Sequence, residues 1–254
     1  MKDFTGKVGI VTGGAQGIGR AIAARLHAAG MTVVIADRDA EAADEWLADM
    51  GRPARLHAVT ADVSAEDDVR RAIAEAVRLG GRLDAVVNNA GFGIWKPVDA
   101  LTLDEWNRVL AVNLTAMFLA AKHAAPHLRA AGGAIVNIAS TRALQSEPNG
   151  EAYAASKGGV VALTHALAVS LGPAVRVNCI CPGWIEVRDR QKASRRQVPQ
   201  HSEADRRQHP VGRVGTPEDI AALAAFLLSG EAGFITGQSF AADGGMTRRM
   251  IYVE

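Results

Sequence analysis

The stretch Thr12-Gly13-Gly14-Ala15-Gln16-Gly17-Ile18-Gly19 decides the fold. It directly follows a short apolar run at residues 8–11 and directly precedes an amphipathic helical pattern at residues 18–29. Glycines at positions 13, 17 and 19 allow a tight turn and let backbone amides approach a pyrophosphate at the helix N-terminus, where the helix dipole favours negative charge. No Lys-Ser or Lys-Thr pair follows, so a nucleoside triphosphate loop is disfavoured. Strand, turn and helix together predict a dinucleotide-binding loop.

Short β-branched runs alternate with longer helical patterns along the rest of the chain. This alternation is typical of a parallel sheet with helices on both faces. The strand cores VVIA and AIVNI are apolar at consecutive positions, which indicates strands covered on both sides. We therefore predict a single α/β domain over residues 1–254, a doubly wound Rossmann fold with a seven-stranded, mostly parallel sheet. The predicted strands cover residues 8–11, 32–36, 54–60, 85–87, 134–138, 175–180 and 238–241, and the predicted helices cover residues 18–29, 40–49, 65–79, 103–131, 151–171 and 217–228.

Composition narrows the classes of function. The 254 residues are 48% hydrophobic, enough for a large core, and 28 Lys and Arg stand against 27 Asp and Glu. A net charge near zero argues against a whole-protein electrostatic surface for nucleic acid or anionic membranes. Apolar runs such as residues 220–228 are about half the length that spans a bilayer. We expect a cytoplasmic protein with a small-molecule substrate, no nucleic-acid partner and no membrane span.

Cysteines and histidines give little sign of a metal or redox site. Cys179 and Cys181 lie two residues apart on a predicted strand, where side chains point the same way rather than at each other. Reduced core thiols are expected, with a redox or metal pair as the alternative. His123 and His127 have i, i+4 spacing, but they lack the glutamate of a zinc protease motif and straddle Pro126. We expect no metal site.

Acidic residues close two of the predicted strands. Asp37 ends the second strand, where a carboxylate can accept hydrogen bonds from the adenosine ribose hydroxyls. The same carboxylate would repel a ribose phosphate, so NAD is favoured, although Arg38 could in principle serve NADP. Asp62 and Val63 follow the third strand on the same rim and suit an adenine contact. The alternative role for both aspartates is helix capping.

A second group of residues carries the candidate chemistry. Ser140 follows the fifth predicted strand, and Tyr153 and Lys157 occur four residues apart in YAASK. Residues at i and i+4 share one helix face, so the ammonium can lie beside the phenol. A phenol with a pKa of about 10 exchanges protons poorly at neutral pH, and a neighbouring cation favours the phenolate. Tyr153 is therefore a candidate general acid/base, with Ser140 holding the substrate oxygen. The alternative is a purely structural role, because in an isolated Tyr-x-x-x-Lys pair the ring is usually half-buried and the lysine amine extends into solvent.

These motifs together resemble the short-chain dehydrogenase/reductase family over essentially the whole chain. TGGAQGIG is similar to the family's cofactor loop, the NNAG at residues 88–91 to its motif after the fourth strand, and YAASK to its YxxxK motif. The resemblance implies a homotetramer and a catalytic tetrad in which Asn113 holds a water of a proton relay and Lys157 also grips the nicotinamide ribose. The implied tetrad is Asn113, Ser140, Tyr153 and Lys157.

The resemblance also extends the cofactor site to the sixth predicted strand, where Pro182 and Gly183 would abut the nicotinamide. The family often has a threonine for the carboxamide shortly after that glycine. Here Val187, preceded by Glu186, stands in its place, which leaves the backbone of Ile185 for the carboxamide. The predicted cofactor-binding residues are Gly13, Gln16, Gly17, Ile18, Gly19, Asp37, Arg38, Asp62, Val63, Asn89, Ala90, Gly91, Tyr153, Lys157, Pro182, Gly183 and Ile185.

The substrate is expected above the candidate acid/base, between the loops that follow strands four, five and six. The long, Arg-rich segment 184–214 is predicted to be a mobile lid, with a subunit interface or a solvated face as alternatives. Charged residues near the site suggest a polar substrate such as a sugar, a polyol or a hydroxy acid. The predicted substrate contacts are Trp95, Arg142, Gln145, Glu147 and Trp184.

Two classes of function remain open. The favoured one is an NAD-dependent oxidoreductase that transfers a hydride between the nicotinamide and a secondary alcohol or ketone. The alternative is a dinucleotide-sensing or scaffold protein of the same fold without catalysis, against which the complete tetrad argues. The helix at 151–171 is rich in Ala, Gly and Val on almost every side, so we expect a partner subunit to cover its outer face.

Overall fold

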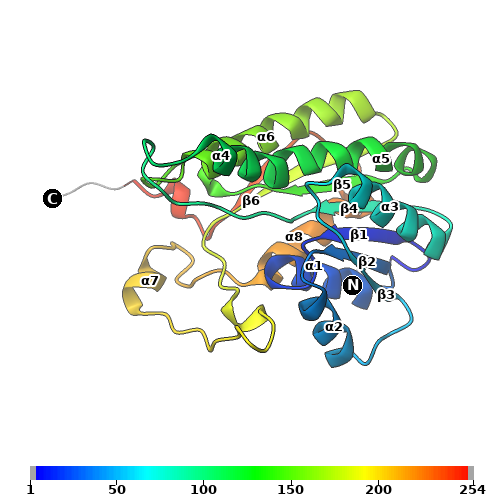
Figure 1. Ribbon diagram of the computed structural model, residues 1–254, viewed down its shortest axis with the longest axis horizontal. Coiled ribbons are helices and arrows are strands. Elements are labelled where there is room, and N and C mark those ends of the chain that lie inside the picture. The colour runs from blue at the N-terminus through cyan, green and yellow to red at the C-terminus, as the bar shows by residue number, and fades with distance from the viewer. Residues whose placement is uncertain (1–3, 251–254) are drawn as a thin grey trace.

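Seven strands form one sheet in the computed structural model of the chain, which describes residues 4–250 (Figure 1). The strand order is β3-β2-β1-β4-β5-β6-β7, and each pair of neighbours in it is parallel. The predicted doubly wound Rossmann architecture is confirmed. The strands are β1 (Val8–Thr12), β2 (Thr32–Asp37), β3 (Leu56–Thr60), β4 (Ala85–Asn88), β5 (Ala134–Ile138), β6 (Arg176–Pro182) and β7 (Ser239–Ala242).

Helices cover both faces of the sheet (Figure 1). On one face, Ile22 and Trp46 are buried against the sheet, and on the other Leu128 is fully buried. Because both faces are covered, the strands are apolar at nearly every position rather than at alternate ones. The first face carries α1 (Gly17–Ala28), α2 (Ala40–Asp49) and α8 (Pro217–Leu228), and the second carries α3 (Glu66–Gly80), α4 (Leu103–Leu110), α5 (Ala116–Ala131) and α6 (Glu151–Leu171).

Several element boundaries differ from the predicted ones. The helix predicted at 103–131 is continuous in direction but contains a π turn, Ala111–Thr115, which separates α4 from α5. A π turn inserts an extra residue and rotates the side chains around it, which hydrophobic periodicity does not reveal. Three strands begin one or two residues later than predicted, since the predicted first residues were 54, 175 and 238. Pairing with the neighbouring strands begins only after these residues. Pairing starts at Leu56 in β3, at Arg176 in β6 and at Ser239 in β7.

The two ends of segment 184–214 are paired with each other, which its polar composition did not suggest. We call these paired ends, residues 184–186 and 215, the base of the segment. Ile185 forms an isolated parallel bridge with Gly215. The Glu186 amide donates to the carbonyl of Gly215 at 2.9 Å, and the Gly215 amide donates to the carbonyl of Trp184 at 3.1 Å. The two ends of the segment are therefore held side by side. Between them lie a short 3-10 turn, Arg188–Arg190, and α7 (Glu203–Arg207), which projects away from the sheet in Figure 1.

The centre of the sheet is where the chain reverses its direction of winding. β1 pairs with β2 on one side and with β4 on the other, which opens a crevice at the carboxyl ends of β1 and β4. The Thr12 hydroxyl accepts hydrogen bonds from the amides of Asn89 and Ala90 at 3.0 and 3.1 Å. The Asn89 side chain donates to the carbonyls of Thr12 and Gly13, both at 3.0 Å. These bonds tie the loop after β1 to the loop after β4.

Two helical spans are long and apolar enough to cross a membrane by length and composition, Leu103–Ala131 and Glu151–Leu171. The apolar runs considered in the sequence had not indicated spans of this length. In the structure, half of the most apolar window of the first span and a third of that of the second are buried, and both spans pack on the same face of the sheet. Core helices of soluble proteins meet the same criterion, so these spans are weak evidence for a membrane.

The two cysteines lie on one face of β6, as the strand period predicts. Cys179 and Cys181 are free and buried, and their Sγ atoms are 4.0 Å apart. Within residues 4–250, no group of three or more His, Cys, Asp or Glu side chains is arranged to hold a metal ion.

Substitution of Gly19 tests how tightly the loop after β1 is packed. A Cβ on residue 19 would lie 2.1 Å from the Gly13 carbonyl oxygen and 2.5 Å from Asn89 Nδ2. We expect Gly19→Ala to lower the free energy of unfolding by about 1–3 kcal/mol, the usual cost of overpacking, in denaturant titrations. Gly230→Ala is the control, because a Cβ there meets nothing within 4 Å. Equal stability of the two variants would contradict the packing argument.

Candidate functional site

A cavity of about 480 Å³ follows the carboxyl ends of the strands and passes over the crevice between β1 and β4. Its wall brings together the loops after six of the seven strands, which lie far apart in the sequence. Of the predicted cofactor-binding residues, only Gly19 does not line it. The residues in its wall that were predicted are Gly13, Gln16, Gly17, Ile18, Asp37, Arg38, Asp62, Val63, Asn89, Ala90, Gly91, Tyr153, Lys157, Pro182, Gly183 and Ile185.

The N-terminus of α1 at this cavity differs from other helix starts in the chain. Gln16 is its N-cap but makes no side-chain capping bond, and the first turn contains no acidic residue. In contrast, α2 is capped by Asp39, and α4, α7 and α8 begin with capping boxes. Helices α3 and α6 also lack a side-chain cap, but both have acidic residues in their first turns. The first amides of α1 are therefore left without a side-chain partner at the end of the helix that favours an anion. This end of the cavity fits the pyrophosphate of a dinucleotide.

The cavity wall beside this loop carries the acidic residues of the predicted adenosine end. The Asp37 carboxylate accepts one hydrogen bond from the Ala15 amide and one from the Asp39 amide, each at 3.0 Å. A carboxylate can accept about four hydrogen bonds. Asp37 is therefore oriented by the backbone and keeps acceptor capacity toward the cavity that it lines. It does not cap α2, because that role belongs to Asp39.

Asp62 serves a local turn as well as the cavity wall. Its Oδ1 accepts from the amide and the hydroxyl of Ser64 at 2.9 and 2.7 Å. These bonds lower the pKa of Asp62, so the side chain stays ionised at neutral pH. The alternative interpretation of Asp62 as a capping residue is thus partly correct: it stabilises the turn before α3, whose own N-cap is Ala65.

The candidate acid/base and its neighbours lie at the other end of the same cavity. Ser140 comes from the end of β5, and Tyr153 and Lys157 come from the first two turns of α6. Lys157 Nζ lies 5.5 Å from the centroid of the Tyr153 ring. The same ammonium donates to the carbonyl of Ile138 at 2.8 Å, which fixes its position beneath the cavity. The i, i+4 spacing has therefore placed both groups on one helix face, as expected.

The electrostatics of this group correct one expectation. Burial raises the pKa of the Tyr153 phenol above its ordinary value, while a hydrogen bond with Ser140 and the charge of Arg142 act in the opposite direction. We expected the neighbouring lysine to lower the pKa of the phenol, and that expectation is wrong, because the effect of burial outweighs the effects that lower the pKa. Burial is also the main influence on Lys157, whose pKa falls to about 8. A partly neutral amine is a weaker stabiliser of a phenolate than a permanent cation.

Asn113 is in place but faces the protein rather than the cavity. It lies in the π turn, is fully buried, and is not part of the cavity wall. Its Oδ1 accepts from the Phe92 amide at 3.0 Å, and its Nδ2 donates to the Phe92 carbonyl at 2.9 Å and to Ser156 Oγ at 3.0 Å. Both N–H groups are thus used inside the protein, and only a lone pair of Oδ1 could serve a water. Asn113 ties the loop after β4 to α6.

The predicted substrate residues divide into two groups. Trp95 lies over Tyr153, with ring centroids 5.7 Å apart and an angle of 33° between the planes. Arg142 forms an ion pair with Glu147, and these residues line a small pocket together with Trp95 and Tyr153.

Two other predicted contacts lie elsewhere. Gln145 is exposed and lines neither the cavity nor that small pocket. Trp184 packs against His201 and His209, with ring centroids 5.7 and 6.2 Å away, and is likewise outside the cavity wall.

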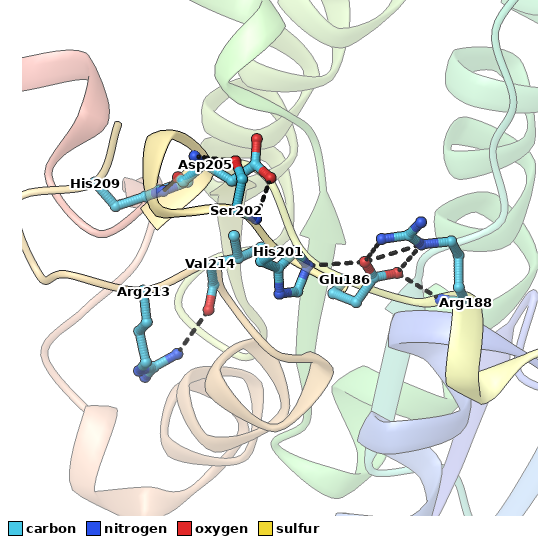
Figure 2. Close-up of polar contacts among 8 residues, drawn as sticks. All are labelled: Glu186, Arg188, His201, Ser202, Asp205, His209, Arg213 and Val214. Atoms are coloured by element: carbon cyan, nitrogen blue, oxygen red, sulfur yellow. Dashed lines mark hydrogen bonds and ion pairs between the residues drawn. The ribbon is translucent and has the colours of Figure 1, made fainter. Parts of the chain in front are cut away.

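Glu186, which precedes the residue that replaces the family's threonine, is a buried carboxylate at the centre of a polar cluster (Figure 2). Its carboxylate accepts from the backbone and the guanidinium of Arg188 and contacts His201 Nε2 at 2.9 Å. These contacts, led by Arg188, lower the pKa of Glu186 to about 2. The cluster links the first part of segment 184–214, at Glu186 and Arg188, to its later part, at His201. It lies next to the bridge between Ile185 and Gly215.

Several residues of the cavity wall were missed. Ala61 and Ala139 directly follow strands, so the rule that ligands bind at carboxyl ends of parallel strands could have found them. Val187 and Gln191 come from segment 184–214, where no sequence pattern shows which side chains fold back over the site. The remaining missed residues are Ala36, Val112 and Ile138.

Comparisons with known proteins agree with this geometry. A family model described as enoyl-(acyl carrier protein) reductase matches residues 13–247. An uncharacterized oxidoreductase of Thermotoga maritima is 49% identical over 255 residues, covering 98% of this chain and 99% of that protein. Glucose 1-dehydrogenase 2 of Bacillus subtilis is 38% identical over 97% of this chain and 96% of its own length.

A solved structure is also closely similar. The apo SCOR enzyme from Clostridium thermocellum has a TM-score of 0.88 and 39% sequence identity, covering 97% of this chain and 95% of that chain. The fold, the cavity over its central crevice and these matches along nearly the full length lead to one conclusion: the protein belongs to the short-chain dehydrogenase/reductase family of oxidoreductases.

Proposed function

We propose that the protein is an NAD-dependent dehydrogenase or reductase that interconverts a secondary alcohol and a ketone, with Tyr153 as general acid/base. Oxidoreductases of this family use NAD or NADP. One observation carries the proposal: a single cavity joins the uncapped N-terminus of α1 and the Asp37 carboxylate to Ser140, Tyr153 and Lys157. Groups suited to a dinucleotide and groups suited to proton transfer thus share one space.

The residues at the chemical end divide the work. A bound nicotinamide supplies or takes up the hydride. The Tyr153 phenol, whose pKa is raised, is protonated at neutral pH and can donate its proton to the oxygen of a ketone. Ser140 can hold that oxygen with a second hydroxyl. Lys157 is fixed by the Ile138 carbonyl on the same helix face, from which it can reach both the phenol and a ribose.

The coenzyme preference is proposed on the charge at residue 37. Asp37 keeps free acceptor capacity toward the cavity for ribose hydroxyls, and its negative charge disfavours a phosphate on the same ribose. Arg38 also lines the cavity, so the preference is expected to be strong rather than absolute.

For the substrate, we propose a hydroxylated compound such as a sugar, a polyol or a hydroxy acid. Beside Tyr153, the Trp95 ring provides an aromatic wall, and the Arg142–Glu147 ion pair provides donors and acceptors at the same place. The relative from Bacillus subtilis is named for a sugar substrate, and a relative from Acinetobacter, 37% identical, is named for cyclohexanol. A panel of sugars, polyols, hydroxy acids and cyclic alcohols would therefore identify the substrate class.

We further propose one catalytic domain over residues 1–254, acting in the cytoplasm as a homotetramer. The single sheet supports one domain, and two free, buried thiols suit a reducing compartment. The outer face of α6 supports assembly, because it exposes mainly small apolar side chains, with Val169 82% exposed. A partner that covers this face would remove that apolar surface from water.

Replacing the phenol tests the catalytic proposal. Tyr153→Phe removes the proton donor but keeps the ring against Trp95, so we expect kcat to fall by about 10²–10⁴-fold, the usual contribution of general acid/base catalysis. NADH binding, measured by isothermal titration calorimetry, should stay close to that of the wild type. Unchanged turnover would refute the role of Tyr153. Wild-type protein that binds NADH but turns over nothing in the panel would instead favour the non-catalytic sensing alternative.

Removing the charge at residue 37 tests the coenzyme proposal. Asp37→Asn keeps a side-chain acceptor but no longer repels a ribose phosphate. We expect the ratio of kcat/KM for NADP to kcat/KM for NAD to rise by about tenfold or more, which corresponds to at least ~1.4 kcal/mol. Asp44→Asn is the matched control, because Asp44 is exposed on α2, pairs with Arg52 and lies outside the cavity wall. An unchanged ratio would mean that another group discriminates.

A charge on the outer face of α6 tests the assembly. Light scattering coupled to size exclusion should give the wild type a mass of about four copies of the 26.7 kDa chain. Ala162→Glu buries a carboxylate in the proposed interface and should shift the protein to smaller species, since an unpaired buried charge is strongly unfavourable. Ala54→Glu, on an exposed turn, should keep the wild-type mass. A smaller wild-type assembly, or an unaffected Ala162→Glu, would contradict the proposal.

A further inference from the structure

One end of segment 184–214 is anchored next to the proposed nicotinamide end of the cavity. Pro182 and Gly183 line that end, and the bridge between Ile185 and Gly215 follows within two residues. Above the bridge, the buried Glu186 carboxylate holds Arg188 on one limb and His201 on the other (Figure 2). The segment therefore leaves the sheet from a fixed base.

Its next residues cross to the other end of the cavity and contact α2. The Lys192 ammonium lies 3.1 Å from the Asp39 carboxylate and also pairs with Glu41. The following amide, of Ala193, donates to Glu45 Oε2 at 2.8 Å. All three acids belong to the N-cap or the body of α2, directly after the proposed ribose-binding Asp37. Residues 153 positions apart in sequence, Lys192 and Asp39, are thus joined across the mouth of the site.

Between these two anchors, the segment forms part of the cavity wall. Val187 and Gln191 line the cavity, and Val187 lies 3.5 Å from where a Cβ on Gly17 would be. Gln16, in the phosphate loop, accepts from the Lys192 amide at 3.0 Å through its side-chain oxygen and contacts Asp39 at 3.5 Å through its nitrogen. The segment, the phosphate loop and α2 therefore meet around one glutamine at the cavity.

We infer that residues 187–193 form a strap across the dinucleotide cavity, and that Lys192 is the positioning residue that keeps the strap closed and so sets how long the dinucleotide stays bound. This inference rests on the proposed function, since it assumes that the cavity holds NAD(H). At the base, the strap is continuous with the backbone pairing between Ile185 and Gly215. At the far end, it is held by the Lys192 ion pairs and by the amides of Lys192 and Ala193. The far end has no such backbone pairing, so it is the part that has to release before the dinucleotide can leave.

The charges at the far end make this contact sensitive to salt. The Lys192 side chain is 13% exposed, whereas Asp39 and Glu41 are 24% and 64% exposed. The two carboxylates raise the pKa of Lys192, so its ammonium stays charged across the neutral range. Ion pairs between partly exposed groups weaken as salt screens them, whereas apolar contacts do not. Release of the dinucleotide should therefore speed up with ionic strength in the wild type.

Stopped-flow displacement of NADH from the full-length protein measures the release rate directly. Lys192→Met keeps the length and apolar stem of the side chain but removes its charge. We expect the NADH dissociation rate to rise about three- to tenfold at low salt and to depend less on sodium chloride than in the wild type. Some dependence should remain, because Arg188 and Arg196 keep their ion pairs. Glu41→Gln removes one of the two carboxylates that pair with Lys192 and should also raise the NADH dissociation rate. The double variant should be no faster than Lys192→Met alone, because both changes remove one contact.

A matched lysine elsewhere provides the control. Lys122 on α5 pairs with Glu66 on α3 at 2.7 Å, away from the cavity wall. Lys122→Met removes the same charge and should keep the wild-type dissociation rate and salt dependence. If Lys192→Met behaves like Lys122→Met while the wild type binds NADH, the strap is wrong and the proposed function stands. If the wild type binds neither NADH nor NADPH, the proposed function fails, and the strap fails with it.

Discussion

The reciprocal hydrogen bonds between Thr12 and Asn89 hold the two central loops of the molecule together. In a doubly wound sheet the connections after β1 and β4 run in opposite directions from the switch point, which leaves a crevice between the two loops. Contacts between side chain and backbone therefore have to fix the position of one loop relative to the other. The Thr12 hydroxyl and the Asn89 amide supply these contacts. Because the side-chain amide of Asn89 also donates to the Gly13 carbonyl, the shape of the loop after β1 depends on a residue 76 positions away in sequence. The position of the uncapped N-terminus of α1 depends on this arrangement, because α1 directly follows the loop.

A second set of buried polar contacts links the sheet to α6, the helix that carries Tyr153 and Lys157. Asn88 donates to Asn137 at 2.8 Å, and Asn137 donates to Thr164 on α6 at 2.9 Å. Asn113 adds a parallel link from the loop after β4 to Ser156, which itself bonds to the carbonyl of Tyr153. Buried amides have to be satisfied, so these bonds allow few alternative positions for α6. The phenol is therefore positioned by contacts that the buried face of its own helix makes with the sheet and with the loop after β4.

Much of the fold could be predicted from local patterns, because strand and helix periods and the glycine spacing are properties of neighbouring residues. The same holds for Tyr153 and Lys157, whose approach follows from helix geometry alone. Features set by contacts between distant residues could not be predicted in this way. Gln145 faces solvent although it lies near Ser140 in sequence, and the wall residues Val187 and Gln191 depend on how a long polar segment folds back. The direction of the Tyr153 pKa depends on burial, which only the packed structure reveals.

The position of Trp95 has an optical consequence. Trp95 is 56% exposed, and its ring centroid lies 5.7 Å from that of Tyr153, the proposed acid/base. Trp46, by comparison, is sealed in the core at 1% exposure. Indole emission overlaps the absorption band of a reduced nicotinamide, so energy transfer from Trp95 would report arrival of the coenzyme. The protein thus carries a fluorescent reporter for its proposed coenzyme without any label.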